Sequence, residues 1–63
     1  MYEQSLLAEQ FTRLLAQTEQ AEQIYAGMAD ETDDPELRQR FQELSREKRR
    51  HAQMTERLLE IVD

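Results

Sequence analysis

The sequence predicts an all-α protein in which two long helices form an antiparallel hairpin and two hairpins form a four-helix bundle. Apolar and small residues recur at alternating steps of four and three along two stretches, which is the spacing of a helix that packs on other helices. A single proline separates these stretches. The chain has 63 residues and no cysteine, so it is too short to bury a good core alone and has no disulfide to compensate.

The first helix is expected over about residues 2–31 and the turn over about residues 32–34. The repeat of the first helix consists of Leu7, Phe11, Leu14, Thr18, Ala21, Tyr25 and Met28. Pro35 disfavours helical geometry at Asp34 and suits the first turn of a new helix. Asp34 is also a good N-cap residue, so the second helix is expected to begin directly after it.

The second helix is expected over about residues 35–62, which makes residues 1–63 a single helical hairpin. Its repeat consists of Leu37, Phe41, Leu44, Lys48, His51, Thr55, Leu58 and Val62, and it is widened by Met54 and Ile61. We call each set of repeating apolar and small residues a stripe. In a two-helix hairpin, the side of each stripe that faces away from the other helix stays in water. A symmetric homodimer is the simplest closed assembly that buries both stripes, and a higher homo-oligomer is left open.

The net charge of −6 is unevenly spread and excludes some partners. The chain up to Asp33 has seven acidic residues and one basic residue, whereas the remainder has seven of each. The negative excess opposes binding to nucleic acid. The basic run from Arg46 to Arg50 resembles a small phosphate-binding patch, but a solvated face that pairs with the first helix is the favoured interpretation.

Neither a membrane nor secretion is predicted for this chain. No apolar run approaches the ~20 residues that a membrane-spanning helix needs. The first residues show no charged segment followed by an apolar one, so no secretion signal is visible. A cytoplasmic location is therefore expected, either free or inside a protein compartment.

Both stripes become polar at the same height when the hairpin is folded about residues 33 and 34. Thr18 then lies level with Lys48 and His51. Buried polar groups lower stability unless they are satisfied. In a first interpretation, Lys48 pairs with Glu22 or Glu19 of the first helix, and His51 forms a hydrogen bond with Thr18 or Tyr25. Such a polar core layer would set the register of the dimer.

Two other interpretations of the same layer remain open. Glu47 and His51 lie one helical turn apart, and with Glu22 they form a candidate set of ligands for a divalent metal such as iron. The ammonium of Lys48 opposes such a site unless its long side chain turns away. Alternatively, His51 is a partly exposed surface residue.

Residues 21–58 contain a series of short sequence fragments whose spacing requires no insertion or deletion. The fragments are Ala21, Tyr25, the turn Asp34-Pro35-Glu36-Leu37, Glu47-Lys48, His51-Ala52 and Met54-Thr55. In this order and spacing they resemble the ferritin-like superfamily, and most of all its short two-helix members, the encapsulated ferritins with a rubrerythrin-type hairpin.

This resemblance implies a half-ferritin hairpin that dimerises into a ferritin-like four-helix bundle, oxidises iron at a di-iron centre and sits inside an encapsulin shell. The family's ligands are a glutamate seven residues before the tyrosine and a Glu-x-x-His pair on the second helix. Carried over to this chain, these positions hold Thr18, Lys48 and His51, and only the histidine is the family's residue.

The leading hypothesis is therefore a ferritin-like homo-oligomer with a degenerate di-iron centre, no catalytic residue, no cofactor, and a structural or interaction role. The alternative is an iron-binding or ferroxidase-type protein whose shifted site uses Glu22, Glu47 and His51. A third class, an RNA-binding helical-hairpin dimer of the Rop type, is opposed by the acidic first half of the chain.

Overall fold

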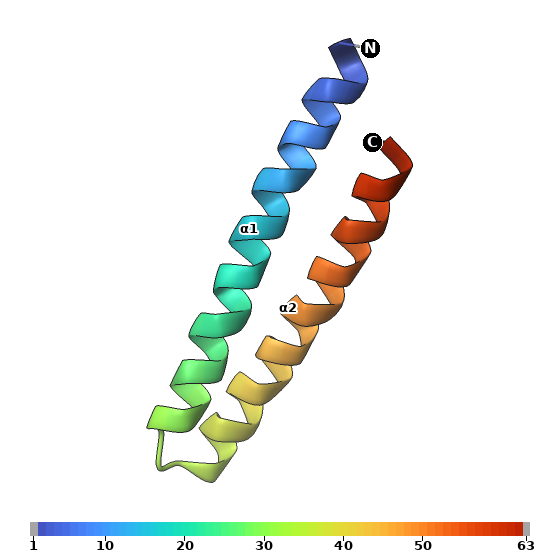
Figure 1. Ribbon diagram of the computed structural model, residues 1–63. Coiled ribbons are helices and arrows are strands. Elements are labelled where there is room, and N and C mark those ends of the chain that lie inside the picture. The colour runs from blue at the N-terminus through green and yellow to red at the C-terminus, as the bar shows by residue number, and fades with distance from the viewer. Residues whose placement is uncertain (1, 63) are drawn as a thin grey trace.

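The computed structural model describes residues 2–62, which form two helices and no strand. Helix α1 spans Tyr2–Glu31 and helix α2 spans Pro35–Val62. The helices lie side by side and antiparallel, and both chain ends lie at the end opposite the turn (Figure 1). The rod measures 50 × 14 × 10 Å. The predicted all-helical hairpin is thus confirmed, and the helix bounds coincide with the expected ranges.

The turn between the helices is held by a compact set of capping contacts. The Asp34 carboxylate accepts hydrogen bonds from the backbone N–H groups of Glu36 (2.9 Å) and Leu37 (3.5 Å), so it caps α2 as the sequence predicts. The Asp34 N–H donates to the Thr32 hydroxyl at 3.2 Å. The Arg38 guanidinium donates to the Thr32 carbonyl at 2.8 Å, so it occupies an acceptor at the end of α1.

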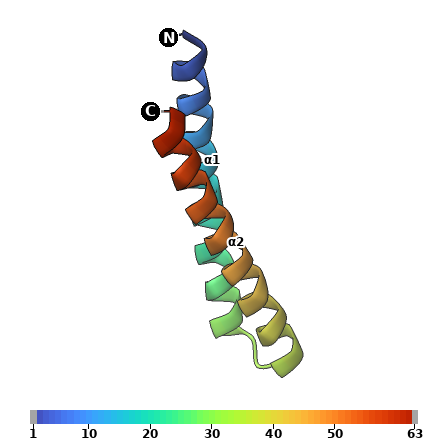
Figure 2. The same ribbon diagram turned by 90° about the vertical axis from the view of Figure 1, so that its right-hand side faces the viewer.

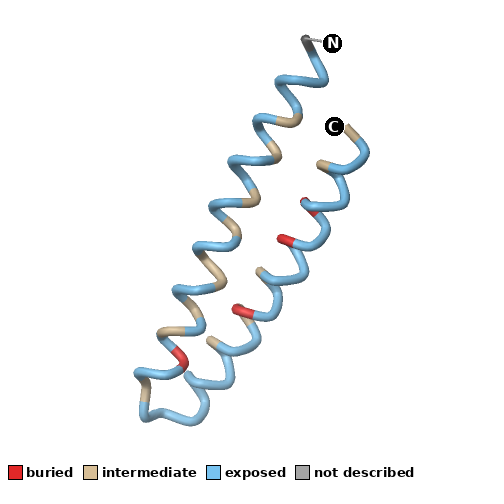
Figure 3. The backbone as a smooth tube through the Cα atoms, in the orientation of Figure 1, coloured by how far each residue is buried: buried red, intermediate tan, exposed pale blue. Residues whose placement is uncertain are grey.

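Small side chains line the contact between the two helices, which we call the helix seam. Its four buried residues are Ala29, Ser45, Ala52 and Thr55. Figure 3 shows three of them along α2 and one on α1 near the turn. Small residues allow two helices to approach closely. In the perpendicular view, α2 lies in front of α1 and crosses it (Figure 2).

Larger side chains complete the seam without being fully buried. The rings of Tyr25 and Phe41 stack across it, with centroids 6.4 Å apart and planes 22° apart. No side chain among the described residues is less than 2% exposed. The single hairpin therefore buries little apolar surface, as its length predicts.

The apolar stripes predicted from the sequence are divided between two environments. Phe11 and Tyr25 of the first repeat are half-buried, as is Phe41 of the second, whereas Leu7 and Leu14 of the first repeat remain exposed. The seam instead extends to Ala29, Ser45 and Ala52, which flank the predicted stripes. Each helix thus packs its neighbour with one edge of its stripe, and the other edge faces outward. Neither described helix has an apolar stretch long enough to cross a membrane.

Candidate functional site

The outward edge of both stripes forms one apolar face. Its residues are Leu7, Leu14, Ile24 and Met28 on α1 and Leu37, Met54, Leu58 and Ile61 on α2. Within this set, Leu7, Leu14 and Met28 are spaced by multiples of seven, as are Leu37 and Leu58, so each series follows one line along its helix. Ile24, Met54 and Ile61 lie off these lines, as does Leu6, the one further exposed large apolar residue among those described, which is about five turns from Ile24 and therefore on the same side of α1.

An open groove of about 330 Å³ lies in the apolar face at mid-height. Lys48 and His51 line it from α2, and Thr18 lines it from α1. The remaining lining residues are Leu14, Met54, Thr55 and Leu58. The structure thus brings together three of the four residues of the predicted polar layer, and none of the described residues that line the groove is a carboxylate.

The fourth residue, Tyr25, lies two helical turns from Thr18 and stacks on Phe41 instead. The Thr18 hydroxyl donates to the Leu14 carbonyl at 2.8 Å. The Thr55 hydroxyl donates to the His51 carbonyl at 2.9 Å. Both threonine hydroxyls are therefore satisfied within their own helices, and in the hairpin alone His51 is an exposed side chain, as the third interpretation describes.

Glu22 has a different partner from the one that the first interpretation expects. Its carboxylate pairs with the guanidinium of Arg49 at 2.9 Å, not with Lys48. The Ser45 hydroxyl donates to the Glu22 carbonyl at 3.2 Å, which is a second polar link between the helices. Arg49 belongs to the basic run, so this part of the run pairs with the first helix as the sequence predicts.

The contacts of Glu22 with Ser45 and Arg49 are not among those predicted from the sequence. A usable signal is the line of Ala8, Leu15, Glu22 and Ala29 at steps of seven, opposite Ser45, Ala52 and Leu59 at the same step. These lines run beside the main stripes and are rich in small residues.

The residues proposed as metal ligands do not gather in the hairpin. Glu22 is held by Arg49, Glu47 is exposed, and His51 lines the groove together with Lys48. Within residues 2–62, no three His, Cys, Asp or Glu side chains lie close enough together to hold a metal ion. The positions that the ferritin-like resemblance assigns to iron ligands hold a threonine, a lysine and a histidine, so the donor set does not fit a di-iron centre.

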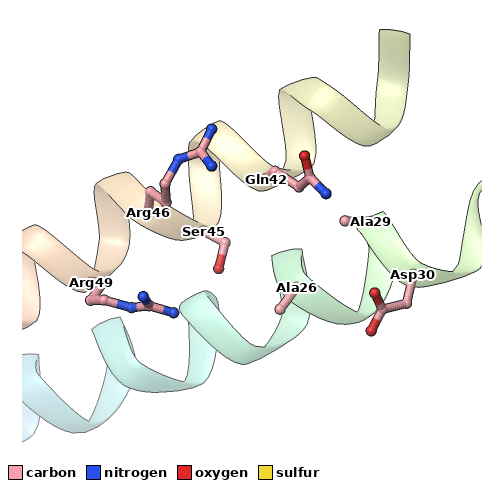
Figure 4. A pocket seen from close by; sticks show the side chains of 7 residues that line it. All are labelled: Ala26, Ala29, Asp30, Gln42, Ser45, Arg46 and Arg49. Carbon is pink, nitrogen blue, oxygen red and sulfur yellow. The ribbon is translucent and has the colours of Figure 1, made fainter. Parts of the chain in front are cut away.

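A second open groove, of about 350 Å³, lies beside the seam between Ala26 and Arg49. In Figure 4, Ser45 is directed towards α1, whereas Arg46 extends away from it. Asp30 also lines this groove, and Arg49 is already paired with Glu22. The groove therefore combines one acid with cations that are paired or directed outward, which is a weak arrangement for binding an anion.

Comparison of the chain with protein-family models, with curated proteins and with solved structures finds no match.

Proposed function

We propose that this chain is one half of a homodimeric four-helix bundle with a ferritin-like scaffold, and that its role is structural or interactive. The apolar face is the observation that carries this proposal, because large apolar side chains lie exposed along both helices of a hairpin with almost no core of its own, and Leu14, Met54 and Leu58 meet at one groove. A second copy is the natural occupant, since it presents the same stripes at the same spacing and closes the assembly by symmetry.

The size of the hairpin supports an association of this kind. A stable interface of standard size covers about 800 Å² on each partner, which is roughly 15% of the 5197 Å² surface of this hairpin. The hairpin is a rod 50 Å long and only 10–14 Å across, so one long side supplies an area of this order. The apolar stripe runs along that side on both helices.

Charge also favours contacts between unlike helices. Within their bounds, α1 carries six acidic residues and one basic residue, whereas α2 carries five acidic and seven basic residues. The net charges are therefore −5 for α1 and +2 for α2. Within the hairpin, the Arg49–Glu22 ion pair joins the positively charged α2 to the negatively charged α1. A docked copy that places α1 beside the partner's α2 would repeat the same attraction.

The dimer is tested by sedimentation equilibrium of the whole chain. We expect a species of twice the 7.6 kDa chain mass at about 100 µM chain, because a micromolar dimer corresponds to about 8 kcal/mol of association free energy. A mass that stays at 7.6 kDa at this concentration would refute the proposal.

The absence of a complete di-iron centre needs a separate test. We propose that the chain has no ferroxidase activity, because Thr18 and Lys48 hold the two carboxylate positions and Arg49 competes for Glu22. Anaerobic titration with Fe(II), followed by exposure to oxygen, measures both binding and oxidation. Stoichiometric binding with catalytic turnover would show that the alternative site of Glu22, Glu47 and His51 is the correct one, and His51→Ala should then abolish the binding.

A further inference from the structure

The groove at mid-height in the apolar face has the chemistry of an anion site. Lys48 provides an ammonium with three donors, and His51 provides a ring N–H in either of its neutral forms. The other side chains that line the groove are aliphatic, methionine or threonine, and none of them is acidic. Both threonine hydroxyls donate to carbonyls of their own helices. The two nitrogen-bearing side chains are thus the groove's remaining donors.

No carboxylate within residues 2–62 forms an ion pair with Lys48. Of the two glutamates of α1 that the sequence offers as partners, Glu22 pairs with Arg49 at 2.9 Å, and Glu19 forms no ion pair with Lys48. On α2, the residues three and four positions from Lys48 are Leu44, Ser45, His51 and Ala52, so no acid lies one turn away. Glu47 precedes Lys48 directly and therefore points about 100° away around the helix. Among the described residues, Lys48 forms no ion pair.

A dimer through the apolar face would bring two of these groups together. Lys48 lies at the midpoint of α2, which runs from Pro35 to Val62. Because it is at the midpoint, a second hairpin docked with its α2 level with the first brings its own Lys48 to the same height, whether the two turns lie at the same end or at opposite ends of the bundle. Two lysines and two histidines then share one layer, and cations removed from water need a compensating negative charge.

Resting on the proposed dimer, we propose that this layer binds a small oxyanion of the phosphate or sulfate class between the Lys48 ammonium groups and the His51 N–H groups of the two copies. Such an anion presents several acceptor oxygens and a negative charge, which match the ammonium of Lys48 and the ring N–H of His51. It would neutralise the two lysines and link the two hairpins. The same cations would exclude a divalent metal from this level.

The test is the dimer dissociation constant of the full chain, measured by sedimentation equilibrium in sodium phosphate and in sodium chloride at equal pH and ionic strength. If phosphate is present at ten times its own dissociation constant, we expect the dimer to be about tenfold tighter than in chloride. Phosphate also strengthens apolar association in general, so variants must separate the two effects.

Lys48→Gln and Arg50→Gln are the matched variants, because each removes one positive charge from α2 and only Lys48 lines the groove. We expect the additional effect of phosphate to disappear in Lys48→Gln and to persist in Arg50→Gln, with helical circular dichroism retained in both. Lys48→Met serves as a second variant that keeps an extended side chain, and it should also be insensitive to phosphate.

Each other result speaks against the site. A phosphate effect of equal size in the wild-type chain and in Lys48→Gln would show a general salt effect and would overturn the anion site while leaving the dimer intact. An equal loss in Arg50→Gln and Lys48→Gln would show that only net charge matters. A chain that stays monomeric in both salts would refute the dimer and the site with it.

Discussion

Truncation of Leu14 gives the sharpest test of the apolar face. Leu14 is 46% exposed in the hairpin, and Leu6 is 43% exposed on the same helix. In an isolated hairpin, Leu14→Ala and Leu6→Ala should therefore lower the free energy of unfolding by nearly the same amount. A partner seated on the groove can distinguish them, because Leu14 lines the groove and Leu6 does not.

The expected magnitude follows from the surface that the partner would cover. Leucine has three carbons more than alanine, so full burial of the difference is worth about 2.4 kcal/mol at about 0.8 kcal/mol per carbon. Scaled by the 46% that the hairpin leaves exposed, the partner would contribute about 1.1 kcal/mol per chain, or about 2.2 kcal/mol per dimer. This energy corresponds to a dissociation constant about 40-fold higher. A cavity left at the interface would add to it.

The assay is sedimentation equilibrium of the wild-type chain and both variants, with circular dichroism to follow helix content. Alanine is at least as good a helix former as leucine, so weaker association cannot be attributed to weaker helices. We expect Leu14→Ala to weaken the dimer by about 40-fold and Leu6→Ala to change it by less than about twofold. Equal dissociation constants for the two variants would refute the assignment of the apolar face.

Three further substitutions test the hairpin itself by thermal or urea unfolding followed by circular dichroism. Asp34→Ala removes the carboxylate that accepts from Glu36 and Leu37, and should lower the unfolding free energy by about 1 kcal/mol; an unchanged midpoint would show that the cap contributes nothing. Gly27→Ala should raise it by about 0.5–1 kcal/mol, because the new Cβ meets nothing within 4 Å and glycine is a poor helix former; a lower midpoint would contradict this. Ala52→Leu should lower it by about 1–3 kcal/mol, because position 52 is only 5% exposed in the seam, while Gln53→Leu at the neighbouring exposed position serves as the control and should not.

Most of the hairpin could be predicted because its determinants are local. Pro35 restricts the residue before it, and Asp34 supplies a cap within two or three residues along the chain. The heptad spacing marks the helical stripes without reference to any other part of the molecule. For the same reason, the polar level of Thr18, Lys48 and His51 could be located by counting from the turn.

The partners within the seam could not be predicted in this way. A stripe three side chains wide has two edges, and the sequence does not state which edge the neighbouring helix covers. That choice depends on the direction in which the turn sets α2 against α1, and here it buries Ala29, Ser45 and Ala52. Glu22 and Lys48 lie at a similar height along the hairpin, which is why the sequence predicts that they pair. The edge along which the two helices pack instead places Glu22 against Arg49.

The sequence by itself determined two helices, their bounds, the turn and the height of the polar level, since each follows from backbone chemistry and helical period. Only the tertiary structure decided which groups meet at that level, because contacts between side chains far apart in sequence depend on how the helices pack. It pairs Glu22 with Arg49, and it leaves Lys48 and His51 together in an open groove without a carboxylate. Because Lys48 stays without an acidic partner among the described residues and Glu22 is already paired, an anion, and not a metal ion, is the ligand to test first.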